Sequence, residues 1–185
     1  MLRDKVILVN ERDEWLGLAD KIAAHRTGLL HRAVSVFVTN SKGDILLQQR
    51  ADGKYHSAGL WSNACCTHPF PGESTAAAAR RRLVEELGIR TPLHKNGSFC
   101  YRAQVGVDML EHELDHIYSG VYDGEIMPDA AEVQAWKWVD EPSLKALLAA
   151  QPRQFTAWFA QVYEAWKAQQ PRTKKPAPET TGAGL

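Results

Sequence analysis

The chain has 185 residues, 44% of them hydrophobic, which is enough to bury the core of one domain. Lysine plus arginine and aspartate plus glutamate each number 22, so no overall field would draw the protein to nucleic acid or to an anionic membrane. No stretch approaches the roughly 18 apolar residues of a membrane span or resembles a signal peptide. The three cysteines are an odd number, and the neighbours Cys65 and Cys66 would be strained if bridged to each other. A reducing compartment fits best, so we expect a cytoplasmic protein.

Short strands and one strong helix are predicted in the first half of the chain. Residues 6–10 form one expected strand, and residues 34–39 and 45–49 form a hairpin around a polar turn. Residues 74–87 predict the clearest helix, because Ser74 and Thr75 offer N-cap oxygens and alanines follow them. Gly88 supplies the expected C-terminal stop of this helix.

The second half continues with strands and ends with helices. Residues 98–105 and 113–122 are rich in aromatic and β-branched residues and should pair through a connection at 106–110, and 133–139 is a further strand candidate. Helices are expected from Asp140 to about Ala149, where Pro142 suits the first turn, and over 155–168. The last helix carries a stripe of Phe155, Trp158, Phe159, Val162 and Trp166.

This order of elements predicts an α/β (α+β) fold, a single domain over residues 1–169 with a mixed sheet between helices. Residues 170–185 are rich in proline and charge, so we expect a disordered tail without a function of its own.

Charged side chains at helical spacing mark the 74–87 segment as a candidate cation site. Arg82 and Glu86 lie four residues apart on one face, as do Arg81 and Glu85. Taken alone, the two pairs are typical of solvated salt bridges. With Glu73 and the flanking Gly72 and Gly88 in register, a cation site is favoured instead, and Glu86 is the candidate Mg²⁺ ligand whose coordination a diphosphate could complete.

Four basic residues could bind that diphosphate. Arg50 ends a predicted strand and Lys54 follows it in a glycine-containing loop, where side chains and free backbone amides can both reach phosphate oxygens. Arg82 and Lys21 are the other two members of this candidate clamp. Each of them alone is more commonly a solvated surface charge.

Histidines and carboxylates form a candidate metal site. His25, His31 and His68 lie outside the clearly predicted helices, in expected loops or at strand edges. On a strand, Glu111 and Glu113 point to one face, and His112 and His116 point to the other. Three imidazoles with two carboxylates suit zinc, manganese or iron, although scattered histidines are usually surface or core residues.

Cys66 is the candidate reactive side chain. It precedes His68 by two residues, and a loop cysteine near a metal and cationic groups can be held as a thiolate, although a free cysteine is more often a buried apolar residue. Residue chemistry alone does not separate it from Cys65. Tyr101, Glu113 and Trp158 complete the candidates, Trp158 being by default a core residue.

These motifs together resemble the Nudix box, and in particular the type I isopentenyl diphosphate isomerases, over about residues 5–165. Two positions of the box differ from the Nudix hydrolase pattern: Thr67 stands in place of glycine and Arg82 in place of glutamate. Arg82 follows the isomerase pattern, whereas Thr67 departs from the glycine often found there, so its backbone must avoid a positive φ. The other matching segments include 61–69, 72–74, 86–88, 101–103 and 111–113.

The resemblance implies a role for each candidate residue. His25, His31, His68, Glu111 and Glu113 would bind one divalent metal, Mn²⁺ or Zn²⁺, and Glu86 would bind Mg²⁺ with the diphosphate. Cys66, rather than Cys65, would be catalytic, with Glu113, Tyr101 and Trp158. The phosphate-binding side chains would be those of Lys21, Arg50, Lys54 and Arg82.

The implied reaction interconverts isopentenyl diphosphate and dimethylallyl diphosphate, by protonation at C4 and deprotonation at C2, in isoprenoid biosynthesis. Glu113, assisted by Tyr101, is expected to deliver the proton while Cys66 acts on the C2 proton.

The alternatives are a Nudix hydrolase of a nucleoside diphosphate derivative and a noncatalytic diphosphate-binding module. We expect a small diphosphate as the partner, no nucleic acid or membrane, and a monomer, a homodimer being the alternative.

Overall fold

The computed structural model describes residues 4–54 and 56–170. The strands are β1 (Lys5–Val9), β2 (Trp15–Asp20), β3 (His31–Thr39), β4 (Ile45–Arg50), β5 (Trp61–Ser62), β6 (Cys65–Thr67), β7 (His94–Gly106), β8 (Met109–Val121) and β9 (Val133–Val139). The helices are α1 (Lys21–Thr27), α2 (Thr75–Leu87), α3 (Glu141–Ala150) and α4 (Phe159–Gln169), with a 3-10 turn at Pro152–Gln154. Within these described ranges, no helix has the length and apolar character needed to cross a bilayer.

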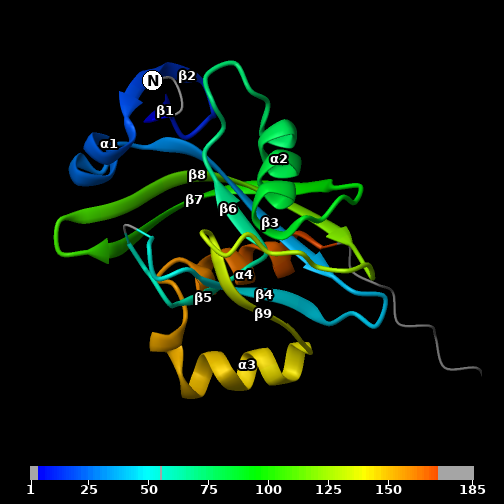
Figure 1. The fold of residues 1–185 in the computed structure, drawn as a ribbon. Helices are drawn as coiled ribbons and strands as arrows, with labels where there is room; N and C mark the ends of the chain where they lie inside the picture. The colour runs from blue at the N-terminus through cyan, green and yellow to red at the C-terminus, as the bar shows by residue number, and fades with distance from the viewer. Residues whose placement is uncertain (1–3, 55, 171–185) are drawn as a thin grey trace, which may run out of the picture.

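The strands of the described residues form one mixed sheet centred on β3 (Figure 1). β3 pairs antiparallel with β1, β4 and β6 and parallel with β8. β7 and β8 form a long antiparallel hairpin, and β9 pairs with β4. The parallel pairing of β3 and β8 sets His31 directly beside Glu113, which fixes the position of the site on the sheet.

Alternation along β3 divides the core into two layers, one on each face of the sheet. Val34, Val36 and Val38 pack with the α2 side chains, while Phe37 packs with those of α4. Figure 1 shows α2 and α4 on opposite sides of the sheet, so the predicted α+β domain with both sheet faces covered is confirmed.

Most of the predicted elements are present with shifted ends. The 34–39 and 45–49 strands and the 133–139 strand correspond to β3, β4 and β9, and Ser74 caps α2 by accepting a hydrogen bond from the Ala77 amide at 3.2 Å. The 106–110 connection is shorter than expected, since β8 already begins at Met109. The predicted 155–168 helix was wrong at its start: α4 begins at Phe159, after an extended Phe155. The predicted tail lies outside the described residues apart from Gln170.

Helix α1 and strand β2 were not predicted, and they correct the expected position of His25. This histidine lies on α1 and is fully buried, rather than in a loop or at a strand edge. α1 ends at Gly28, whose φ of 65° lets the chain turn at once into β3, and a Cβ there would lie 2.9 Å from Leu110 Cδ2. The glycine therefore brings His25 and His31 to the same place in the fold.

Candidate active site

Five potential metal ligands converge at one end of the sheet. Their ligand atoms all lie within 4.8 Å of one another, and the residues are His25, His31, His68, Glu111 and Glu113. They come from α1, from β3, from the loop after β6 and from β8. The sequence-predicted cluster is therefore assembled in space, and His112 and His116 lie outside it, as the alternation along β8 predicts.

Hydrogen bonds orient two of the imidazole rings toward the cluster. His25 Nδ1 lies 2.6 Å from the Lys21 carbonyl oxygen, and His31 Nδ1 lies 2.8 Å from that of Leu29. A carbonyl only accepts, so each Nδ1 carries the proton and each Nε2 is left to bind a cation. His31 Nε2 is 3.2 Å from His68 Nε2, which in turn is 2.9 Å from a Glu113 oxygen. This inward-facing set of nitrogen and oxygen donors fits a divalent transition metal.

The ionisation of the cluster also suits a metal. Burial lowers the pKa of His68 to about 4, so its ring is neutral at neutral pH. Burial alone would raise the pKa of Glu111, but the adjoining imidazoles of His25 and His56 outweigh it and hold that pKa well below its ordinary value. A neutral imidazole and an ionised carboxylate are the forms that bind metals.

Tyr101 and Glu113 form a hydrogen-bonded pair beside the cluster. The two residues are direct cross-strand neighbours on β7 and β8, and Tyr101 donates to Glu113 Oε2 at 2.6 Å. Burial and the nearby Glu113 charge raise the pKa of the Tyr101 hydroxyl well above its ordinary value, so it remains a donor. Tyr101, Glu113 and His31 thus form a row across three neighbouring strands.

Cys66 lies on strand β6 rather than in a loop as predicted. Its Sγ donates to Asn63 Oδ1 at 3.3 Å and lies 3.5 Å from Ser35 Oγ. Burial, and then the nearby Asp115 carboxyl group, raise the pKa of the thiol to about 12. Cys66 faces the cavity, whereas Cys65 packs in the core beside α2, so the structure separates the two neighbours.

The four candidate phosphate-binding residues line the same cavity of about 540 Å³ as Cys66, Tyr101 and the two glutamates of the cluster. Burial lowers the pKa of Lys21 and lowers that of Lys54 to about 8, with neighbouring cationic side chains adding to the effect. Both shifts come mainly from the loss of solvent, and nearby carboxylates oppose the effect of the neighbouring positive charge. An anionic group entering the cavity would relieve that charge.

The predicted helix pairs are present and tie the clamp to Glu86. Arg82 Nε lies 2.6 Å from Glu86 Oε1, and Gln48 donates to Glu86 Oε2 at 2.6 Å. Glu132, which the sequence did not single out, forms ion pairs with both Lys54 and Arg82. Each carboxylate oxygen of Glu86 keeps a second lone pair, so the donor set is compatible with Mg²⁺.

Trp158 lies at the wall of the cavity and also in the core. It is 3% exposed and precedes the first turn of α4. The Arg50 guanidinium carbon is 5.5 Å from its ring centroid, and the ring of His56 meets it edge-on at 5.6 Å. Trp158 is therefore a core residue, as predicted by default, and also lines the cavity.

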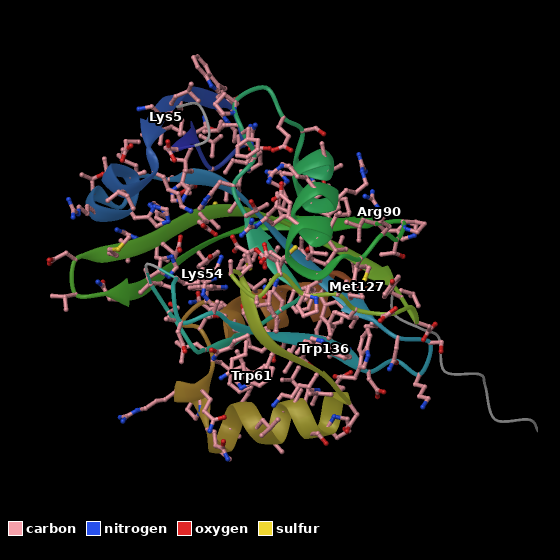
Figure 2. The ribbon with its side chains drawn as sticks, in the orientation of Figure 1. Lys5, Lys54, Trp61, Arg90, Met127 and Trp136 are labelled. Carbon is pink, nitrogen blue, oxygen red and sulfur yellow. The ribbon has the colours of Figure 1, made fainter. Side chains whose placement is uncertain are left out.

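His56 is a fourth histidine at the site that sequence reasoning missed. Its Nε2 lies 3.3 Å from Glu111 Oε1. The only sequence signal for His56 was its position two residues after Lys54, in the loop between β4 and β5. Lys54 is labelled in Figure 2. Thr67, in contrast, behaves as predicted, with extended backbone at the end of β6.

Comparison of the sequence with known proteins shows the family of this chain. The NUDIX domain model matches residues 29–159. The chain is 49% identical over 158 residues to a Burkholderia multivorans protein named isopentenyl-diphosphate Delta-isomerase, covering 85% of this chain and 90% of that protein. It is also 49% identical over 156 residues to the protein of the same name from Serratia proteamaculans, covering 84% and 87%.

Solved structures support the fold alone. A crystal structure of a Deinococcus radiodurans protein superposes with a TM-score of 0.71 at 21% identity, covering 90% of this chain and 99% of that one. The MutT protein of Methanosarcina mazei gives a TM-score of 0.61 at 20% identity, covering 76% and 94%. With the family model and the relatives in agreement, the chain belongs to the NUDIX domain family and, within it, to the isopentenyl-diphosphate Delta-isomerases.

Proposed function

We propose that the protein interconverts isopentenyl diphosphate and dimethylallyl diphosphate. The observation that carries the proposal is that one cavity is lined by basic side chains, by a cysteine and by a tyrosine–glutamate pair beside five potential metal ligands. Relatives at 49% identity that are named isopentenyl-diphosphate Delta-isomerase support it. A cavity of this size fits a small ligand.

The basic side chains would hold the diphosphate. Lys21, Arg50, Lys54 and Arg82 line the cavity, and Arg82 can exchange its contact with Glu132 for a phosphate oxygen. Glu86 would bind Mg²⁺ together with the diphosphate. The reacting carbons would then be directed toward Cys66 and Glu113.

The five-residue cluster would hold Mn²⁺ or Zn²⁺. This cation, when bound, would supply positive charge that favours the thiolate of Cys66 and makes a protonated Glu113 a stronger acid. The chain's own contribution is to hold the rings of His25 and His31 through backbone carbonyls and to orient Glu113 through Tyr101.

Proton transfer would proceed between two groups lining the cavity. Glu113, assisted by Tyr101, gives a proton to C4, and the alkene electrons form the new C–H bond and leave a tertiary cation at C3. Cys66 takes the proton from C2, and that electron pair forms the new double bond. The buried ring of Trp158 can stabilise the cation by about 2 kcal/mol, and the low exposure of Trp158, Tyr101 and Glu113 would limit the water that could trap it.

The test is isomerisation in heavy water. Metal-loaded protein incubated with isopentenyl diphosphate should yield dimethylallyl diphosphate that carries deuterium, detected by mass spectrometry. Cys66→Ala should lower kcat by about 10²–10⁴-fold while the dissociation constant for the diphosphate changes little. Phosphate release without deuterated product would instead indicate a hydrolase, and binding without either reaction would indicate a noncatalytic module.

A further inference from the structure

His56 connects the diphosphate-binding loop to the metal cluster. It lies in the loop between β4 and β5, two residues after Lys54, yet its side chain reaches β8 and contacts Glu111. Only 9% of the residue is exposed. Its backbone carbonyl accepts a hydrogen bond from Arg50 Nη2 at 3.2 Å, and its ring meets Trp158 edge-on. One residue thus contacts a metal ligand, a member of the basic clamp and the aromatic wall.

The contacts define which nitrogen of His56 donates. A carboxylate only accepts, so Nε2 carries the proton toward Glu111 Oε1 at 3.3 Å. Nδ1 lies 3.1 Å from the Ser57 hydroxyl oxygen, which holds the ring from its other side. Ser57 has a φ of 52°, a left-handed conformation that is uncommon outside glycine, so the loop turns sharply just where the ring is held.

The carboxylate of Glu111 is shared between two histidines. Its Oε2 lies 3.1 Å from His25 Nε2 within the cluster, while Oε1 faces His56. His56 itself is outside the set of five atoms that converge within 4.8 Å. It is therefore placed to orient a ligand rather than to act as one, the arrangement by which neighbouring groups tune metal sites.

We propose that His56 is a positioning residue that fixes the Glu111 carboxylate and, through the loop that carries Lys54, couples diphosphate binding to metal binding. The coupling to diphosphate rests on the proposed function, whereas the effect on the metal does not. A diphosphate that holds Lys54 and Arg50 also holds the backbone that presents His56. By linkage, a metal that holds Glu111 strengthens the diphosphate site by the same factor.

Two substitutions separate the hydrogen bond from the bulk of the ring. His56→Ala removes the donor, and we expect metal affinity, measured by chelator competition without substrate, to fall by about 10–100-fold. His56→Gln keeps an N–H donor at the position of Nε2 and should recover most of that affinity. His94→Ala removes an exposed histidine at the start of β7 and should match the unchanged protein.

The coupling is measured by calorimetry. Inorganic diphosphate, with excess Mg²⁺ so that it does not strip the site, is titrated into metal-free and metal-loaded protein. The unchanged protein should bind it about 5–150-fold more tightly when loaded, and His56→Ala should abolish most of this difference.

Two results would overturn the proposal: a metal affinity and coupling in His56→Ala equal to those of His94→Ala, or a His56→Gln protein as impaired as His56→Ala. If the unchanged protein binds metal and diphosphate but does not isomerise, the proposed function fails while the role of His56 is still decided by these constants.

Discussion

Burial changes the charge of the individual residues that would meet the substrate. Lys54 is the clearest case, because burial and the adjoining cations lower its pKa to about 8 while the nearby Glu86 carboxylate opposes the shift. The charged groups around it are Glu86, Glu132, Lys21, Arg50 and Arg82. A lysine with this pKa loses its charge within the range in which enzymes are assayed.

This residue gives a pH prediction with a defined sign. Below pH 8 Lys54 is protonated and would bind the diphosphate, and above pH 8 it becomes neutral. We expect KM for isopentenyl diphosphate to rise by up to tenfold per pH unit above about pH 8. Lys54→Arg should remove this rise, because a guanidinium stays charged to above pH 12.

The unchanged protein and the Lys54→Arg variant serve as controls for each other. Titration of the substrate itself is common to both proteins and cancels in the ratio of their KM values from pH 7 to 10. A ratio that stays constant over that range would contradict the lowered pKa of Lys54.

The sequence predicted those candidate residues that belong to a recognisable motif or spacing pattern. Glu111 and Glu113 follow from strand alternation, and the resemblance selected His25 and His68. His56 and Glu132 could not be chosen, because their partners are 55 and 78 positions away on other strands or loops and no spacing rule joins them. Cys66 was expected in a loop, because the pairing of β6 with β3 that buries it is not visible in its local sequence.

Element by element, the sequence signal failed where segments are short. α1 has only seven residues, too few for a helical period to stand out, and β2 is mostly exposed, so neither was predicted. α4 was predicted four residues too long at its start, because Phe155 and Trp158 fit the apolar stripe although they precede the helix. Long or capped elements such as α2 were found because cap and propensity agree.

The packing of α4 on β3 yields a stability prediction. Phe37 of β3 is fully buried and stacks on Trp166 of α4, with ring centroids 4.4 Å apart and planes at 2°. Phe37→Ala should lower the free energy of unfolding by about 3–5 kcal/mol, measured by urea denaturation. Val107→Ala, at a side chain that is 96% exposed, should change it by less than about 0.5 kcal/mol. Similar values for the two variants would be inconsistent with this packing.

Over the whole molecule, the metal cluster joins segments that are far apart in the chain. Its five candidate ligands come from α1, β3, the loop after β6 and β8, so a bound cation would cross-link these four segments. The fold class was predictable because strand and helix patterns determine the layers, whereas the pairing of β6 with β3, which brings His68 beside His31, was not.

Removal of the metal should therefore be visible as a loss of thermal stability. A cation present at 100 times its dissociation constant stabilises the native state by about 2.7 kcal/mol, which corresponds to about 5–10 °C in Tm for a domain of this size. Calorimetry before and after chelation measures the loss, and re-addition of Zn²⁺ or Mn²⁺ shows which ion restores it. His68→Ala should make Tm insensitive to the chelator, and a chelator effect of the same size in that variant would place the metal elsewhere.

The row formed by Tyr101, Glu113 and His31 limits how this chain can change in length. Insertion of one residue inside β8 before Glu111 would turn the strand over, so that neighbouring side chains replaced the two glutamates on the cavity face. The exposed turn at Val107 and Asp108 lies beyond the paired row, and a hairpin lengthened there by whole pairs of residues keeps the alternation. Functional relatives should consequently vary in length at this turn and keep a fixed number of residues between it and the second glutamate.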